Sequence, residues 1–211
     1  DSQIIFSNTE YEKSTYKRYF YRFDIETKQT CRVNKIGIDV CKKGFYNTCI
    51  LDNYIYTNSY TIKGDNIETT LYKVSITTGG VEKLYSVEKD VKVIFLSNRY
   101  ALLSGSKFEM DKEHCDLKKD MDGEYNYSIL CDFIENTEYK IHDTRITLGI
   151  RDHFIPYDVD GERYIVFEES YMEDWELETM YKEKIAKSEF LRNSYKESLN
   201  IISLDRFVKA I

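Results

Sequence analysis

Two short acidic segments carry the residue types that bind calcium: Asp120-Met-Asp122-Gly123 and Asp158-Val-Asp160-Gly161. An EF-hand loop needs an acid at its first position and a glutamate at its twelfth, and neither segment has them. The residues at those two positions are Lys118 and Ile129 in the first segment, and Pro156 and Phe167 in the second. Asp-Gly between strand-like runs is typical of hairpin turns, and we interpret both segments in that way.

The sequence lacks the residue spacing that a zinc site or a nucleophilic catalytic site needs. His114-Cys115, Cys131 and His142-Asp143 have the side chains of a zinc site, but no ligand spacing supports one. The sequence has no Gly-x-Ser-x-Gly and no Gly-rich phosphate loop. Asp52 and Asp158 are acids that a hydrolase could use, although acids at strand ends are more often exposed caps. We therefore predict no catalytic residue, no metal site and no cofactor.

The elements that would position such residues are short strands. Tyr54–Thr57 is an aromatic and β-branched run that suits a half-buried strand, and a polar interval follows at Asn58–Thr69. After a second apolar run, Thr78-Gly79-Gly80 supplies a turn, because glycine accepts the positive φ that tight hairpins demand. Val81–Tyr85 is a third strand, so this stretch predicts one small antiparallel sheet.

This pattern occurs four times along the chain. Aligning Phe6, Tyr56, Leu103 and Phe167 gives spacings of 50, 47 and 64 residues, and aligning Asp24, Ser75, Asp132 and Ser203 gives 51, 57 and 71. A further short run precedes the second, third and fourth copies, whereas the first copy begins at its second strand. We expect a loop at Tyr11–Lys17 and a strand within Leu199–Phe207. A period near 50 residues predicts an all-β, β-propeller-like array of about four antiparallel blades.

The second copy resembles a blade of the TolB-like and six-bladed β-propellers. In that resemblance an aromatic strand, YIYTNS, precedes a hairpin of the type Leu-Tyr-Lys-x-(Asp/Ser)-x-x-(Thr/Asp)-Gly, here LYKVSITTG. IIFSN and YRFDIETKQ repeat the pattern with Arg22 and Asp24 in the matching places, the third copy is looser, and the fourth keeps IISLD. The resemblance implies one β-propeller-like domain over residues 1–211, either a section of a larger propeller or a small ring. It implies a fold rather than an activity.

The connection between the second and third strands lengthens along the four copies. Counted between the aligned residues, it measures 18, 19, 29 and 36 residues, whereas the return intervals are 32, 28 and 35. Loops of one class emerge on one face of a propeller, and insertions gathered there often mark the binding side. The fourth insertion predicts a helix near 171–191, because Ser170 and Glu173 form a capping box and Leu177, Tyr181 and Ile185 follow at helical spacing.

Aromatic residues in these intervals are the candidate partner-binding residues: Tyr60, Phe108, Tyr171, Trp175 and Tyr181. Trp175, the single tryptophan, lies off the apolar stripe of the predicted helix and among four acids. We expect it to be partly exposed, so that Trp175→Ala costs on the order of 1 kcal/mol rather than the ~3–5 of a buried tryptophan.

Charge and cysteine content restrict the partners and the compartment. The net charge is −7, with 15 Lys/Arg and 12 Asp/Glu in residues 1–105 against 15 and 25 in residues 106–211. An acidic chain without a basic stripe does not suit nucleic acid, and no apolar run is long enough to span a membrane. Five cysteines without a CxxC pair favour free thiols and hence the cytoplasm, with export after removal of a signal as the alternative.

Loop asymmetry and missing catalytic motifs together favour a non-catalytic binding module that recognises a protein or another ligand through the long loops. Two alternatives stay open. One is a propeller domain of a glycan or peptide hydrolase. The other is a structural module that associates through exposed blade edges, because unpaired strand edges are templates for association.

Overall fold

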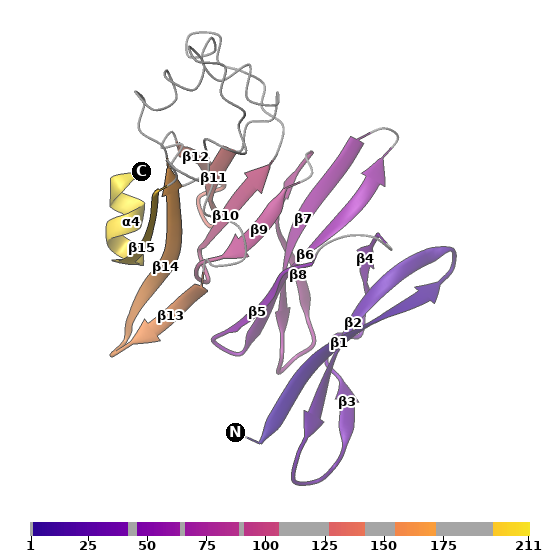
Figure 1. The fold of residues 1–211 in the computed structure, drawn as a ribbon. Helices are drawn as coiled ribbons and strands as arrows, with labels where there is room; N and C mark the ends of the chain where they lie inside the picture. The colour runs from indigo at the N-terminus through magenta and orange to yellow at the C-terminus, as the bar shows by residue number, and fades with distance from the viewer. Residues whose placement is uncertain are drawn as a thin grey trace. The chain divides into compact units, whose positions relative to one another are not determined.

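The computed structural model describes residues 2–41, 46–63, 66–88, 91–105, 127–141, 155–171 and 196–211. These residues form four antiparallel sheets that follow one another along the sequence (Figure 1). The chain divides into two compact units, residues 1–101 with 132–136 and residues 102–131 with 137–211. Among the described residues, no helix combines the length and apolar character needed to cross a membrane.

The first sheet is built on one long hairpin, β1 (Gln3–Glu12) and β2 (Thr15–Asp24). Strand β3 (Thr30–Arg32) pairs with the end of β2, and β4 (Ile38–Val40) pairs with its beginning. Strand β1 has β2 as its one neighbour among the described strands.

The predicted loop at Tyr11–Lys17 is wrong. The strands pair through Glu12 and Thr15, and only Lys13 and Ser14 form the turn, with φ values of 46° and 70°. A two-residue hairpin turn with positive φ at both positions is usually marked by Asn-Gly or Asp-Gly. Lys13-Ser14 is not such a pair, so no turn signal in the sequence indicated this hairpin.

The second sheet has the order β5 (Thr48–Leu51), β6 (Tyr54–Lys63), β7 (Asn66–Ser75) and β8 (Val81–Val87). The expected polar interval at Asn58–Thr69 is wrong, because most of it belongs to β6 and β7. Two of its buried polar side chains are hydrogen-bonded: the Asn58 side-chain carbonyl accepts from the Asn47 amide at 2.7 Å, and the Thr69 hydroxyl accepts from the Val91 amide at 3.4 Å. The polar residues of this interval therefore belong to hydrogen-bonded strands and do not mark a loop.

The third sheet has the order β12 (Thr137–Ile141), β11 (Tyr127–Asp132), β10 (Tyr100–Gly105) and β9 (Lys92–Phe95). The fourth comprises β13 (Ile155–Val159), β14 (Glu162–Tyr171) and β15 (Lys196–Ser203). The short runs predicted before the second, third and fourth copies are confirmed as β5, β9 and β13.

The expected strand within Leu199–Phe207 is wrong beyond Ser203, where helix α4 (Leu204–Ala210) begins. Leu204 and Phe207 are both buried, and residues three apart lie on one face of a helix. The helix predicted near 171–191 lies outside the described residues, apart from Tyr171, which ends β14.

Strand register supports the alignment of the copies with one correction. In the paired strands, Asp24 lies opposite Gln3, Ser75 opposite Tyr54, and Ser203 opposite Tyr164. Gln3, Tyr54 and Tyr164 are each at or near the start of the second strand of their copy. Counted from them, Phe6 and Phe167 correspond to Thr57 rather than Tyr56, and a shift of one residue moves a side chain to the other face of a sheet.

The core of the first unit lies between its first two sheets. Phe20, Val33, Ile38 and Val40 of the first sheet meet Ile55 and Val74 of the second. On the other face of β6 the Tyr56 ring lies 5.7 Å from that of Phe95, and its side chain is fully buried. The Tyr56 hydroxyl has no hydrogen-bond partner in the described part of the chain, and burial raises the pKa of Tyr56 to about 12.

Candidate functional site

The predicted partner-binding residues are scattered. Tyr60 lies on β6, is buried, and donates its hydroxyl to the Val91 carbonyl at 2.7 Å. Tyr171 is the last residue of β14, and nothing is described of its side chain. Phe108, Trp175 and Tyr181 lie outside the described residues, as do His114, Cys115, His142 and Asp143. The assignment of these residues to a binding site stays a prediction.

Three of the acidic residues singled out by the sequence, Asp52, Asp158 and Asp160, lie in or beside hairpin turns. Asp160 and Gly161 have positive φ between β13 and β14, so this segment is a hairpin turn as predicted. Asp158 accepts from the Arg163 guanidinium at 2.7 Å, and this bond lowers the pKa of Asp158. Asp52 is exposed in the turn before β6. Within the described ranges, no three His, Cys, Asp or Glu side chains gather as a metal site would require.

The described residues bring together a different cluster, on the face of the first sheet that points away from the second. Opposite residues of paired strands share a face, so Phe6 and Tyr21, like Tyr21 and Arg32, lie side by side. We call this surface the arginine–tyrosine face. It consists of Phe6, Glu10, Glu12, Tyr19, Tyr21 and Arg32.

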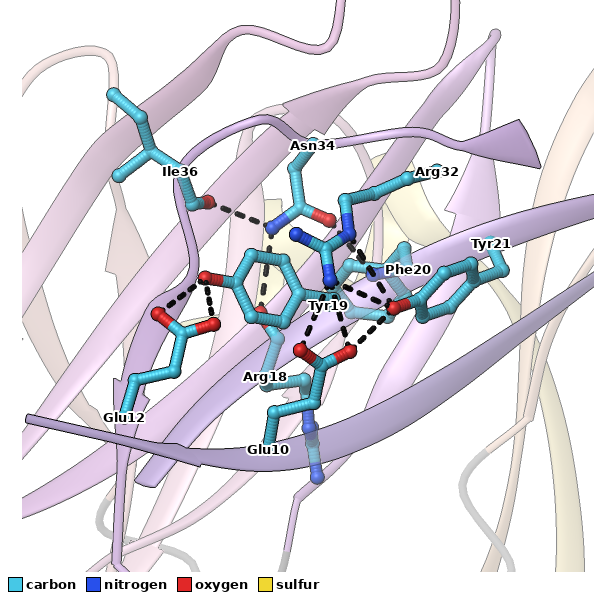
Figure 2. A network of polar contacts seen from close by, with 9 residues as sticks. All are labelled: Glu10, Glu12, Arg18, Tyr19, Phe20, Tyr21, Arg32, Asn34 and Ile36. Carbon is cyan, nitrogen blue, oxygen red and sulfur yellow. Dashed lines mark hydrogen bonds and ion pairs between the residues drawn. The ribbon is translucent and has the colours of Figure 1, made fainter. Parts of the chain in front are cut away.

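Arg32 is the centre of the arginine–tyrosine face (Figure 2). Its guanidinium carbon lies 3.8 Å from the centroid of the Tyr19 ring, a cation–π contact. Its Nη2 donates to both Glu10 carboxylate oxygens at 2.9 Å and to the Tyr21 hydroxyl at 3.0 Å. The Tyr21 hydroxyl in turn donates to Glu10, and the Phe6 ring stacks on Tyr21 at 5.4 Å.

The electrostatics of this face follow from the hydrogen bonds. The Tyr21 hydroxyl and the Arg32 guanidinium hold the pKa of Glu10 below its usual value. Burial, and the bond that the Tyr19 hydroxyl donates to Glu12 at 3.0 Å, raise the pKa of Tyr19. Each charge therefore has a partner, and the cluster contains no activated nucleophile or base. Tyrosine and arginine are also the residue types that are enriched in protein interfaces.

Asn34 fixes the segment that carries Arg32. It is fully buried, and its carbonyl accepts from the Phe20 amide at 2.7 Å while its amide donates to the Arg18 and Ile36 carbonyls (Figure 2). These bonds satisfy backbone groups of β2 in the gap between β3 and β4. The sequence analysis missed Arg32 and Asn34 because the contacts of both residues depend on the pairing with β2, and no local motif marks either residue.

Comparisons with known proteins concern the fold alone. No protein-family model matches the chain, and no curated protein sequence matches it. Among solved structures, the β-propeller domain of the trilobed protease from Pyrococcus furiosus matches with a TM-score of 0.46 and 13% identity, over 82% of this chain and 47% of that one. The structure of YjhT matches with a TM-score of 0.42 and 8% identity, over 97% of this chain and 66% of that one.

The chain thus spans about half of the first structure and about two thirds of the second. With scores this low, the fold assignment rests on the antiparallel sheets themselves. The fold is all-β and β-propeller-like.

Proposed function

We propose that this chain is a non-catalytic binding module of β-propeller type, related to the TolB-like propellers, which recognises an extended segment of a protein partner beside strand β1. The long intervals assigned to the binding side lie largely outside the described residues, so the support comes from the first sheet. One observation carries the proposal: β1 is a ten-residue strand that contributes Phe6, Glu10 and Glu12 to the arginine–tyrosine face, and no described strand pairs with its outer edge.

The edge of β1 has few of the devices that usually protect such strands: its two charged residues, Glu10 and Glu12, lie near its end and are bonded to Arg32 and Tyr19. Edge strands are commonly short, or carry lysine, proline or bulges that prevent further pairing. Strand β1 pairs with β2 without a register shift, and its sequence QIIFSNTEYE has no lysine and no proline. An extended peptide can therefore continue the sheet through main-chain hydrogen bonds.

Side chains along β1 supply the selectivity. Phe6, on the arginine–tyrosine face, is 43% exposed, and Ile4, two residues before it on the same side of β1, is 50% exposed. A strand added beside β1 would place alternate side chains next to them, because side chains alternate between the two faces of a sheet. We expect the bound segment to carry apolar residues at every second position.

Selection from a displayed library of extended peptides, with the full chain immobilised, tests this proposal. The peptides that are recovered should show the alternating apolar pattern, and Phe6→Lys should weaken their binding at least tenfold. Ile50→Lys is the matched control, since Ile50 is also an exposed strand residue, at 51%, but lies on β5. Equal loss in both variants, or no recovered pattern, contradicts the proposal.

A proline pair separates main-chain pairing from side-chain contact. Neighbouring residues of a strand direct their amides alternately toward and away from the adjacent strand. One of Ser7→Pro and Asn8→Pro should therefore keep the β1–β2 pairing and remove an outward donor. We expect the variant that stays folded by circular dichroism to lose peptide binding. Unchanged binding by that variant would show that the peptide does not pair with β1.

The same edge of β1 favours a second candidate, association of two copies of the chain through this strand. Sedimentation velocity over a range of concentrations distinguishes it: a dimer that Phe6→Lys dissociates supports self-association, and a monomer at all concentrations removes it. The hydrolase alternative stays a prediction, to be tested by turnover of glycan and peptide substrates.

A further inference from the structure

Arg18 is a buried cation between the first and second sheets. It lies on β2, on the same face as Phe20, and is 8% exposed. Its Nη1 donates to the Thr57 hydroxyl of β6 at 3.2 Å, and its guanidinium carbon lies 3.8 Å from the centroid of the Tyr46 ring. This residue is on the opposite face of the sheet from the arginine–tyrosine face and plays no part in the function proposed above.

Arg18 is buried and has no acidic partner in the described residues. Three of the other arginines make ion pairs: Arg32 with Glu10 at 2.9 Å, Arg99 with Asp132 at 2.6 Å, and Arg163 with Asp158 at 2.5 Å. Arg18 Nε is buried and lacks an acceptor within the described ranges. Thr57 cannot supply more, because its hydroxyl also lies 3.1 Å from the Asn47 carbonyl and 3.1 Å from the Thr48 hydroxyl.

An uncompensated buried charge is costly, and stacking on one aromatic ring offsets only part of that cost. Burial lowers the pKa of Arg18 to about 10, so the side chain still carries its proton at neutral pH. A second unsatisfied polar group lies on the same strand as Thr57. Ser59 Oγ is buried and without a partner in the described part of the chain, and residues two apart on a strand point to the same side.

We propose that Arg18 anchors a binding site for a small oxyanion, a carboxylate or a phosphate, which the Nε edge of the guanidinium holds and to which the Ser59 hydroxyl donates. Guanidinium groups bind such ligands through two parallel N–H···O bonds, and the Nη1 bond to Thr57 leaves the Nε edge for that purpose. Because Arg18 belongs to the first sheet and Thr57 and Ser59 belong to the second, the anion would join the two sheets.

Calorimetric unfolding of the full chain tests the site, with chloride replaced by acetate, citrate or phosphate at constant ionic strength. Citrate and phosphate also stabilise proteins by exclusion from the surface, so each anion is compared between the wild type and Arg18→Met. We expect a saturable rise of several degrees in the wild-type Tm that Arg18→Met lacks. The response to carboxylates against phosphate identifies the ligand class.

Two further variants make the test decisive. Arg22→Met, on the same strand and face but half-buried, should keep the response to the anion. Arg18→Lys keeps the charge but not the Nε edge, and should weaken the apparent affinity at least tenfold; it also serves if Arg18→Met does not fold. An equal response in the wild type and in the folded Arg18 variant, or none in the wild type, overturns the proposal.

Discussion

At the residue scale, three of the four side chains aligned at the ends of the third strands, Asp24, Ser75 and Asp132, accept hydrogen bonds from the backbone of the turn that follows. Asp24 accepts from the Glu26 and Thr27 amides at 3.0 and 2.8 Å, and Asp132 accepts from the Ile134 and Glu135 amides at 3.0 and 3.1 Å. Ser75 accepts from the Thr78 amide at 3.1 Å. Short polar side chains that bond to the backbone two and three residues ahead nucleate turns. This chemistry is local, and for that reason the sequence could predict it.

Asp132 adds an ion pair to this turn. Its side chain is 1% exposed, and Oδ2 accepts from Arg99 Nε at 2.7 Å. Burial alone would raise the pKa of Asp132, but the Arg99 bond and the two backbone amides outweigh it, and the pKa lies below its ordinary 3.8. A carboxyl whose pKa is lowered by folding stabilises the fold above its unfolded pKa. That contribution disappears as pH falls through the folded value.

We predict that Asp132→Asn lowers the free energy of unfolding by about 1–2 kcal/mol at pH 7, since the amide keeps the turn but loses the charge. The deficit should shrink as the pH falls from the ordinary pKa of 3.8 through the lower pKa of folded Asp132, because the wild-type carboxylate is then protonated and loses the same charge. Urea unfolding across this range measures it. Asp24→Asn is the control, because that turn has no arginine ion pair among the described residues, and its loss should be smaller. A deficit independent of pH would show that the charge is not its cause.

At the scale of elements, the turn after β7 brings the second sheet against the first. Gly79 has a φ of +74°, and a Cβ placed there would lie 2.2 Å from the Val33 carbonyl oxygen. Sequence analysis expected the positive φ at this turn, which is confirmed. It could not reveal the contact with Val33, because that depends on how two sheets pack.

Alanine substitution at three glycines separates the cost of the positive φ from the cost of the close approach to Val33. Gly161 has a φ of +83°, and a Cβ there would meet nothing within 4 Å, whereas a Cβ at Gly80 would lie 3.4 Å from Thr78 Oγ1 without a positive φ. Gly161→Ala should cost about 1–2 kcal/mol for the left-handed backbone alone. Gly79→Ala should cost about 2–5 kcal/mol, because steric overlap adds to that strain. Gly80→Ala should stay within about 0.5 kcal/mol.

Urea unfolding of the three alanine variants provides the comparison. The order of the losses is the decisive quantity, with Gly79 above Gly161 and Gly161 above Gly80. Equal losses at Gly79 and Gly161 would mean that the close approach to Val33 does not exist in solution.

At the scale of the whole molecule, the antiparallel all-β fold could be predicted and the site could not. Apolar runs, turn chemistry and spacing follow from neighbours in sequence, so the antiparallel sheets and their order were accessible. The contacts around Arg32 join residues up to 22 positions apart, and Arg18 reaches Thr57 across 39. These contacts depend on the register of the paired strands. An error of one residue in that register moves a side chain to the other face of the sheet, as the alignment at Tyr56 shows. The prediction of a single domain stays a prediction beside the two compact units.

The buried Tyr56 hydroxyl has a spectroscopic consequence. Burial holds its pKa at about 12, above the ordinary 10.0, so neutral Tyr56 stabilises the fold below pH 10 and this stability is lost as pH rises through 12. In an alkaline titration followed by tyrosinate absorbance, exposed tyrosines should ionise first and reversibly. Tyr56 should follow late, together with the loss of near-ultraviolet circular dichroism. Tyr56→Phe should reduce that late step, to which Tyr19 also contributes because its pKa is raised, and a titration curve unchanged by the substitution would place the late absorbance elsewhere. Tyr56 thus links alkaline unfolding to one optical signal among the 19 tyrosines of the chain.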